Sequence, residues 1–339
     1  MKKIAITGAT GAIGLALIDK CIEQGTEAYV FVRKDSGRIA RIPEHPLVHK
    51  IHCALDEMKY FNKRENGSVE SRGFRLTGVR DEDKVYNIPE LDVFYHFAWM
   101  KAFGAEARDD LKTQIKNIEY AIDSVDLAKR LGCKRYIGAG SQAEYGRKNE
   151  PLRADTCCDP ENGYGMAKLA AGEMTRLQCE KLGMEHIWTR VLSVYGPGDG
   201  EGTLVMSVIR DALDGKNPEC TKAEQIWDYL YSKDAGEVFY ALGERGVHSK
   251  TYVVGSGNSR PLRDYIDEIC RACMETDDRK TVRPRYGAKP YGAKQVMHLE
   301  ADISELVEDT GYSPQTPFNT GIRETVERMI KDGQEIKDR

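Results

Sequence analysis

The sequence predicts an α/β fold: a doubly wound parallel sheet with a smaller C-terminal lobe. Three observations predict it. Short β-branched and aromatic runs alternate with longer helical patterns through the first half of the chain, a glycine-rich turn joins the first run to the first helical pattern, and this regularity ends near residue 195. Apolar strands separated by helices are typical of a parallel sheet that helices cover on both faces. We therefore expect a large domain over residues 1–195 and a smaller lobe over residues 196–339.

The expected elements of the first half can be placed in order. Strands are expected at residues 3–7, 28–32, 48–53 and 93–97, with a fifth beginning at 135–137, and helices at 12–24 and 111–131. Each of these helices is followed by a glycine, a common helix stop. Residues 57–90 carry seven basic and seven acidic residues and are too long for an ordinary crossover. We expect a surface insertion with some local structure there, with a contact to substrate or a second subunit as the alternative.

The second half is less regular. It begins with the break Gly196-Pro197-Gly198. Residues 252–255 are typical of a strand, which we expect to return to the sheet, and residues 262–273 are typical of a helix.

Composition excludes several classes of protein. The 339 residues include 50 Lys+Arg and 54 Asp+Glu, a net charge of −4, so no basic footprint indicates nucleic acid. No apolar run approaches the roughly 20 residues of a membrane-spanning helix, and the first residues run into a strand without a secretion signal. The nine cysteines are scattered, and the closest sets, Cys157-Cys158 and Cys270-x-x-Cys273, have no second Cys/His pair nearby, which predicts reduced thiols in a cytoplasmic protein and no metal site.

A glycine-rich turn lies directly between the first expected strand and the first expected helix. Its sequence is Gly8-Ala9-Thr10-Gly11-Ala12-Ile13-Gly14. The first glycine permits a sharp turn, the second lets the backbone approach a pyrophosphate, and the third lets the helix pack closely on the strand. The free N–H groups of the helix then face the phosphates. The arrangement predicts a Rossmann-type dinucleotide site, with Gly8, Thr10, Gly11, Ala12, Ile13 and Gly14 at the cofactor.

The residues after the second expected strand indicate which dinucleotide binds. An NAD site usually carries an acidic residue here, which holds the ribose 2′-hydroxyl. In this chain the strand ends in Arg33-Lys34, and Arg38 follows. Guanidinium groups suit the 2′-phosphate of NADP. The alternative is that all three are solvated loop cations. NADP is therefore favoured, and NAD is possible.

Tyr164 and Lys168 are four residues apart, which places them on one face of a helix. The pKa of a free tyrosine is about 10, so it is a poor base at neutral pH. A cation one turn away stabilises the phenolate and draws its pKa toward the working range. Ser141, 23 residues earlier, follows the fifth expected strand. The pattern predicts proton transfer by the tyrosine.

Together these motifs resemble the extended short-chain dehydrogenases/reductases of the NAD-dependent epimerase/dehydratase branch, whose members mostly modify nucleotide-activated sugars. The resemblance covers nearly the whole chain apart from residues 57–90. The matching stretches are residues 7–14, 96–99, 140–146, 164–168, 190–198, 227–231, 301–304 and 310–312.

The resemblance implies a role for several residues. Tyr164 would be the general acid/base, and Lys168 would lower its pKa while binding the nicotinamide ribose. Ser141 would hydrogen-bond the reacting sugar oxygen. Residues 96–98 resemble the stretch that passes over the cofactor, so Ala98 is expected to contact it. His96 follows an apolar strand, where a histidine is more often structural, and is left out of the catalytic set.

The resemblance also narrows the reaction. Dehydratases of the family typically place Asp-Glu directly after the catalytic Ser or Thr, where this chain has Gln142-Ala143. These side chains cannot exchange protons, so a 4,6-dehydratase is disfavoured. A 4-keto reductase that consumes NADPH is slightly favoured over a 4-epimerase that retains NAD. An alternative of another class is a non-catalytic NADP-sensing regulator on the same fold.

Substrate contacts are the least defined part. The family commonly has Asn before Val-Tyr-Gly-Pro, where this chain has the shorter Ser193, and often an acid at the position of Ala54 or Asp56. Gln142 and Ser193 are expected to contact a nucleotide-diphosphate sugar. Arg283 is expected at its diphosphate, in a basic stretch that also holds Arg285 and Lys294; a solvated face is the alternative. By analogy with the family, residues 111–131 and 164–183 are expected to form a homodimer.

Overall fold

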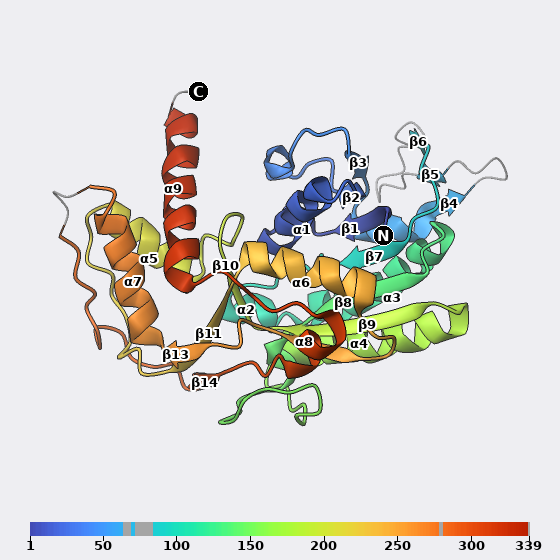
Figure 1. Cartoon of the computed structure of the whole chain (residues 1–339). Helices are drawn as coiled ribbons and strands as arrows, with labels where there is room; N and C mark the ends of the chain where they lie inside the picture. Colours follow the sequence, from blue (N-terminus) through green and yellow to red (C-terminus); the bar gives the residue numbers. More distant parts are fainter. Residues whose placement is uncertain (64–68, 72–83, 278–280, 338–339) are drawn as a thin grey trace.

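A computed structural model of the chain describes residues 1–63, 69–71, 84–277 and 281–337 (Figure 1). Its main sheet has seven strands in the order β12-β9-β8-β7-β1-β2-β3, and every pairing is parallel. The predicted fold class is confirmed. The strands are β1 (Lys3–Thr7), β2 (Glu27–Val32), β3 (Val48–His52), β7 (Val93–His96), β8 (Arg135–Ser141), β9 (Glu185–Val191) and β12 (Thr251–Val254).

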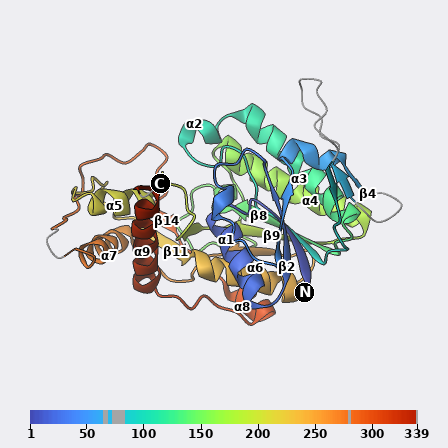
Figure 2. The same cartoon turned by 90° about the horizontal axis from the view of Figure 1, so that it is seen from above.

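Helices cover both faces of this sheet, as Figure 2 shows. Helices α1 (Ala12–Glu23), α6 (Ser232–Arg245) and α8 (Ser304–Thr310) lie on one face, and α3 (Leu111–Arg130) and α4 (Gly163–Leu182) on the other. Each face buries its own apolar cluster, with Ile6 and Phe239 in the first and Phe94 and Val125 in the second. Two-sided burial explains why the strands consist of nearly continuous apolar runs.

The second half of the chain completes the large domain. Strand β12 pairs with β9, so the expected return strand is present. Helix α6 packs on α1 at close range because residue 236 is glycine: a Cβ there would lie 2.5 Å from the carbonyl carbon of Ala16. The chain therefore passes between the two lobes more than once after residue 195.

The smaller lobe is built around a mixed four-stranded sheet. Strand β11 (Ile226–Tyr231) pairs with β10 (Ser193–Tyr195) and β14 (His298–Leu299) in parallel and with β13 (Ser259–Pro261) antiparallel. Helices α5 (Leu204–Leu213), α7 (Leu262–Met274) and α9 (Phe318–Lys337) accompany it (Figure 1). Its core gathers Tyr195, Ile209 and Ile266 among others.

The insertion at residues 57–90 carries local structure in its described parts. Strands β4 (Phe61–Lys63), β5 (Val69–Ser71) and β6 (Lys84–Tyr86) form a small antiparallel sheet. Residues 64–68 and 72–83 lie outside the described residues. The short elements that complete the fold are η1 (Ile39–Arg41), η2 (Leu55–Tyr60), α2 (Ala105–Arg108) and η3 (Gln142–Glu144).

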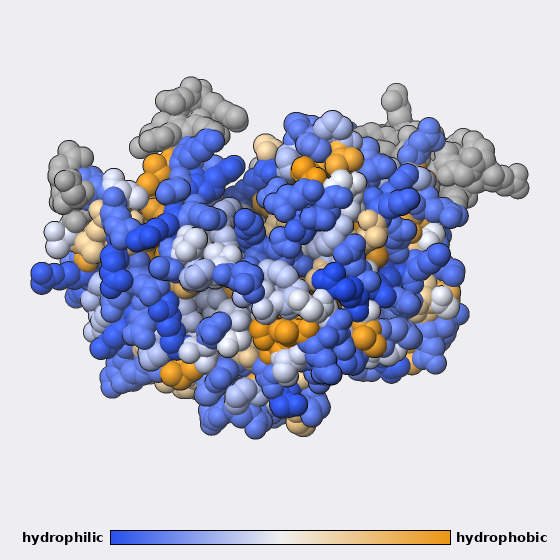
Figure 3. All heavy atoms as spheres, in the orientation of Figure 1, coloured by the Kyte–Doolittle hydropathy of each residue, from blue (hydrophilic) through white to orange (hydrophobic). Residues whose placement is uncertain are grey.

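The surface in Figure 3 is mostly hydrophilic, with small separate apolar patches. In the described part of the chain, no helix is long and apolar enough to span a membrane. A search of the same residues finds no group of three His, Cys, Asp or Glu side chains placed to hold a metal ion. All nine cysteines are free thiols, and Cys157 is exposed.

Candidate active site

A cleft of about 1510 Å³ runs from the main sheet to the smaller lobe. The strand order reverses at β1, since β2 and β3 lie on one side of it and β7 on the other. In open parallel sheets such a reversal leaves a crevice beyond the carboxyl ends of the strands, where ligands bind. The cleft lies at this place, because residues that follow β1, β2, β3, β7 and β8 all line it.

The glycine turn forms one wall of the cleft. Gly8 has a left-handed φ of +73°, and a Cβ on it would lie 2.6 Å from the Ala98 nitrogen. A Cβ on Gly14 would lie 2.6 Å from the Gly8 carbonyl oxygen. Helix α1 begins after Gly11 without a side-chain cap, so its first N–H groups stay available to a ligand. Residues 7–14 all line the cleft, and this cradle fits a pyrophosphate.

The loop after β2 brings two of the three predicted cations to the cleft. Arg33 and Arg38 line it, together with Ser36 and Gly37, whereas the exposed Lys34 lies outside its lining. Asp35, the acidic residue nearest to the end of β2, is exposed and also outside the lining. Two guanidinium groups thus face the cleft where an NAD site usually has a carboxylate.

The ends of β3 and β7 complete the dinucleotide side. Ala54 and Asp56, the two positions considered for the usual acid, both line the cleft. Ala98 lines it as expected, beside Trp99. His96 lies beneath, 2% exposed, with its Nδ1 3.0 Å from Thr7 Oγ1, a structural position.

Tyr164, Lys168 and Ser141 form another wall of the cleft. Tyr164 and Lys168 lie in the first turns of α4, whose N-terminus Asn162 caps by accepting a hydrogen bond from Gly165 N at 2.8 Å. Ser141 ends β8, and its Oγ accepts a hydrogen bond from Ala143 N at 3.2 Å. All three side chains line the cleft and are less than a tenth exposed.

The Lys168 ammonium contacts a backbone carbonyl group and an indole ring. Its Nζ donates to the Ala139 carbonyl oxygen at 2.5 Å and lies 3.8 Å from the centre of the Trp99 ring, but 5.8 Å from the centre of the Tyr164 ring. Burial lowers the pKa of Lys168 to about 7, against the effect of the Glu144 carboxylate, which raises it. Lys168 can therefore exchange its proton near neutral pH.

The environment of Tyr164 has a second cation that the sequence did not indicate. The Arg108 guanidinium carbon lies 4.4 Å from the centre of the Tyr164 ring. Burial raises the pKa of Tyr164; the Arg108 charge and hydrogen bonding with Ser141 lower it, and Glu144 raises it further. The pKa of the phenol is thus raised overall, where the sequence predicted a depression caused by Lys168.

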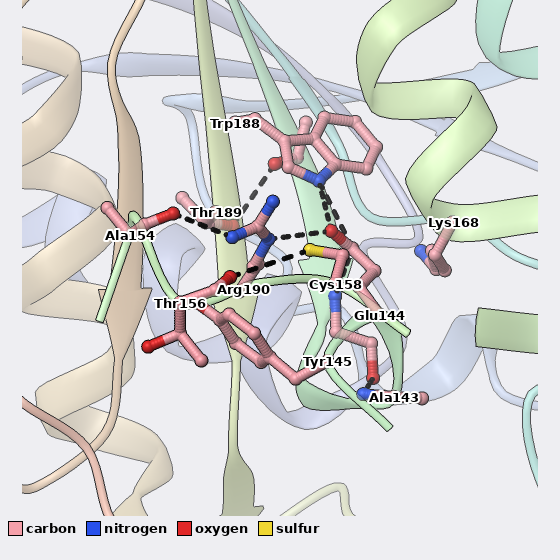
Figure 4. Close-up of polar contacts among 12 residues, drawn as sticks. Ala143, Glu144, Tyr145, Ala154, Thr156, Cys158, Lys168, Trp188, Thr189 and Arg190 are labelled. Atoms are coloured by element: carbon pink, nitrogen blue, oxygen red, sulfur yellow. Dashed lines mark hydrogen bonds and ion pairs between the residues drawn. The ribbon is translucent and has the colours of Figure 1, made fainter. Parts of the chain in front are cut away.

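Behind this wall lies a fully buried carboxylate. Glu144 accepts hydrogen bonds from Ser141 N at 2.8 Å and Trp188 Nε1 at 3.1 Å, and pairs with Arg190 Nε at 2.9 Å (Figure 4). Figure 4 shows Lys168 on the other side of Glu144 from Arg190. Burial raises the pKa of Glu144, and Arg190 opposes that shift. The hydrogen bond from Ser141 N fixes the backbone at Ser141, and the negative charge of Glu144 raises the pKa of Lys168.

Two of the three residues expected to contact the substrate line the cleft, and the third does not. Gln142 and Ser193 line the cleft, and Ser193 Oγ accepts a hydrogen bond from Trp227 Nε1 at 2.9 Å. Arg283 is exposed and lies outside the lining, and its backbone N–H donates to Asn217 Oδ1 at 2.8 Å. Lys294, from the same basic stretch, lines the cleft instead. Of this basic stretch, Lys294 and not Arg283 therefore reaches the cleft.

Sequence reasoning missed several residues of the site. Arg108 and Asp199 line the cleft, and Glu144 and Arg190 support it. Glu144 lies in the 3-10 turn η3 directly after β8 and meets Arg190 of β9 only in the folded chain, so the local sequence did not indicate this ion pair. Arg108 lies in an irregular polar stretch and carried no signal either.

Comparison with known proteins agrees with this geometry. The chain is 29% identical over 186 residues to a dTDP-glucose 4,6-dehydratase of Escherichia coli, an alignment that spans 50% of this chain and 49% of the dehydratase, so the chain matches about half the length of that relative. It is 26% identical to a dTDP-4-dehydro-6-deoxyglucose reductase of Escherichia coli over 97% of this chain and 96% of the reductase.

Among solved structures, the fold matches a UDP-N-acetylglucosamine 4-epimerase from Methanobrevibacter ruminantium in complex with UDP-N-acetylmuramic acid. The TM-score is 0.79 at 20% identity, over 98% of this chain and 99% of the epimerase. The model of the NAD dependent epimerase/dehydratase family matches residues 4–255, which include the glycine turn and the tyrosine–lysine pair. The chain therefore belongs to the NAD dependent epimerase/dehydratase family.

Proposed function

We propose that this protein is an NAD(P)-dependent oxidoreductase of nucleotide-diphosphate sugars that reduces a keto group at sugar C4. One observation carries the proposal: Tyr164, Lys168 and Ser141 line the same cleft as the glycine turn of residues 8–14. A phenol that exchanges a proton thus shares one cleft with the cradle of a dinucleotide. This arrangement suits the joint transfer of a hydride and a proton to one carbonyl group.

The cofactor would be held by the residues already described. The glycine turn and the start of α1 would bind the pyrophosphate, and Lys168 the nicotinamide ribose. Arg33 and Arg38, both at the cleft, favour the 2′-phosphate of NADP. When bound, the dihydronicotinamide supplies the hydride.

The chain's own residues would handle the proton. Tyr164 donates its phenolic proton to the keto oxygen as that oxygen gains charge. Ser141 Oγ accepts a hydrogen bond from Ala143 N, so its own O–H remains the donor toward the Tyr164 phenol and, with substrate bound, toward the same keto oxygen. Lys168, with its pKa lowered to about 7, can return a proton to the phenolate. Burial of all three groups excludes water from the exchange.

The residues after Ser141 disfavour a 4,6-dehydratase. Gln142 lines the cleft and Ala143 is buried, and neither side chain can take or give a proton. The next residue, Glu144, is a carboxylate, but it lies behind the cleft in its pair with Arg190. Similarity to a 4-dehydro sugar reductase over nearly the whole chain supports the reductase.

A 4-epimerase that retains NAD is the second candidate. The same phenol would first accept the proton of the sugar hydroxyl and then return it. The exposure of Arg33 and Arg38 favours this candidate, since exposed loop cations need not recognise a phosphate. A non-catalytic NADP-sensing regulator is disfavoured because Tyr164, Lys168 and Ser141 are all in place.

We also propose a homodimer. Five large apolar side chains are exposed on the neighbouring helices α3 and α4, with Ile115 at 66% and Leu111 at 59%. Exposed apolar patches on a pair of long helices are typical of a subunit interface. The other three are Met166, Met174 and Leu177.

One experiment separates the candidates. The purified protein is incubated with a panel of nucleotide sugars and 4-keto sugars, while NADPH absorbance and product stereochemistry are followed together. Net oxidation of NADPH with a 4-keto substrate supports the reductase; interconversion without net oxidation, on retained NAD, supports the epimerase. Tyr164→Phe should abolish turnover and still bind cofactor, and Tyr120→Phe, another tyrosine of the cleft lining, is the matched control.

A further inference from the structure

Arg108 is an unassigned cation at the reaction centre. It ends the short helix α2, lines the cleft, and its guanidinium carbon lies 4.4 Å from the centre of the Tyr164 ring. Within the described part of the chain, its Nε is buried and has no hydrogen-bond partner. A buried donor without a partner is costly, so its retention calls for a role.

The backbone holds Arg108 against the start of α4. Gly163, the residue before Tyr164, donates its N–H to Asp109 Oδ1 at 2.9 Å. A Cβ on Gly163 would lie 2.6 Å from Leu111 Cδ2 and 3.1 Å from the Arg108 carbonyl oxygen. A larger residue at this position would displace the Leu111 side chain and press on the Arg108 carbonyl. The segment that carries Arg108 is therefore fixed to the turn that carries Tyr164.

Four groups define the electrostatics of the phenol. Lys168 lies on the same helix, but its ammonium is engaged by the Ala139 carbonyl and the Trp99 ring. Glu144, from η3, is negative and disfavours the phenolate; Ser141, from β8, hydrogen-bonds the phenol. Arg108, from α2, is the cation that packs on the ring itself.

We propose that Arg108 is a positioning residue for proton transfer, which holds the Tyr164 ring in place and stabilises its phenolate. The proposal rests on the proposed role of Tyr164 as the acid/base. Stacking on the ring face fixes the direction of the hydroxyl, and the positive charge offsets both burial and the Glu144 carboxylate. In a reductase this makes the phenol a stronger acid toward the keto oxygen.

A measurement that needs no substrate tests the charge effect. The protein is produced with a fluorinated tyrosine, whose phenol is more acidic, and the fluorine resonance that disappears in Tyr164→Phe is followed against pH. Arg108→Gln should raise the titration midpoint of this resonance by about one pH unit. Arg108→Lys keeps the charge and should shift it by less than half as much. Arg323→Gln, at an exposed ion pair in the smaller lobe, is the control.

Two results would overturn the proposal: a midpoint that stays at its wild-type value in Arg108→Gln, or equal shifts in Arg108→Gln and Arg108→Lys, which would indicate packing without a charge effect. Far-ultraviolet circular dichroism confirms that both variants fold. With an active substrate, the alkaline limb of kcat/KM should move to higher pH by the same amount in Arg108→Gln. A shifted resonance without turnover on any nucleotide sugar would refute the proposed function and leave the Arg108 assignment intact.

Discussion

Removing the charge of Glu144 should be strongly destabilising. The carboxylate is fully buried and pairs with Arg190, which is 8% exposed. Glu144→Gln keeps an oxygen for the N–H groups of Ser141 and Trp188 but leaves the Arg190 guanidinium buried without a counter-charge. Breaking one partner of a buried ion pair costs about 3–5 kcal/mol. That is a large fraction of the roughly 5–15 kcal/mol by which native proteins are stable.

A double-mutant cycle isolates the pair. Urea unfolding at pH 7 gives the free energy of unfolding for wild type, Glu144→Gln, Arg190→Met and the double variant. Each single change should cost about 3–5 kcal/mol, and the double variant about as much as one of them, because it leaves no unpaired charge. The exposed pair of Arg323 and Glu275 is the control, and Arg323→Met should cost less than about 1 kcal/mol.

Additive losses in the double variant would refute this reasoning, since they would mean that the two charges do not stabilise each other. Glu144→Gln should also lower the pKa of Lys168 further, because the Glu144 carboxylate raises it. Cofactor binding should persist, since Glu144 lies behind the cleft wall.

Four further predictions concern the cofactor, pH and assembly. Gly14→Ala places a Cβ 2.6 Å from the Gly8 carbonyl oxygen, so NADPH affinity measured by fluorescence should fall at least tenfold; unchanged affinity would contradict the cradle. Replacing Arg33 and Arg38 together by alanine should remove a preference for NADPH over NADH in kcat/KM, and an unaltered ratio would exclude a 2′-phosphate contact. Burial lowers the pKa of Lys168 to about 7, whereas its pKa in the unfolded chain is about 10.4. Between these two pH values the unfolded state binds more protons than the folded state. The free energy of unfolding should therefore rise with pH across that window. Lys168→Met should lose this rise. The urea midpoint of each protein is measured at pH 7 and pH 9, and an equal change of midpoint in wild type and variant would contradict the prediction. Ile115→Glu should convert a dimer into a monomer in light scattering, whereas a wild-type protein that is already monomeric would exclude the interface.

Local patterns carried most of the fold prediction. The alternation of apolar runs and helical spacings placed β1 and α1 within a residue of their observed bounds, because these elements are set by neighbours in sequence. The glycine turn could be read for the same reason. The packing of α6 on α1 could not be predicted from local patterns, because it depends on a contact between Gly236 and the backbone of Ala16, which are 220 positions apart.

The site was predictable only where one element carries the pattern. Tyr164 and Lys168 share a helix, so their spacing was informative. The pair of Glu144 and Arg190 joins residues 46 apart, and Arg108 meets Tyr164 only because α2 docks on α4. Arg283 lies outside the cleft lining and Lys294 within it, because a cluster of charges in sequence does not show which of its members the fold brings to the cleft.

The interleaving of the two lobes limits how this chain can be divided. A chain cut after residue 195 would leave β9 as an unpaired sheet edge and expose the apolar face of α1, because β12 and α6 would both be missing. Unpaired edges of this kind template aggregation. The smaller lobe consists of several segments that lie between β9 and α6, between β12 and α8, and after α8 along the chain. To change substrate specificity, these segments would have to be replaced one by one, because no single C-terminal piece contains the smaller lobe alone.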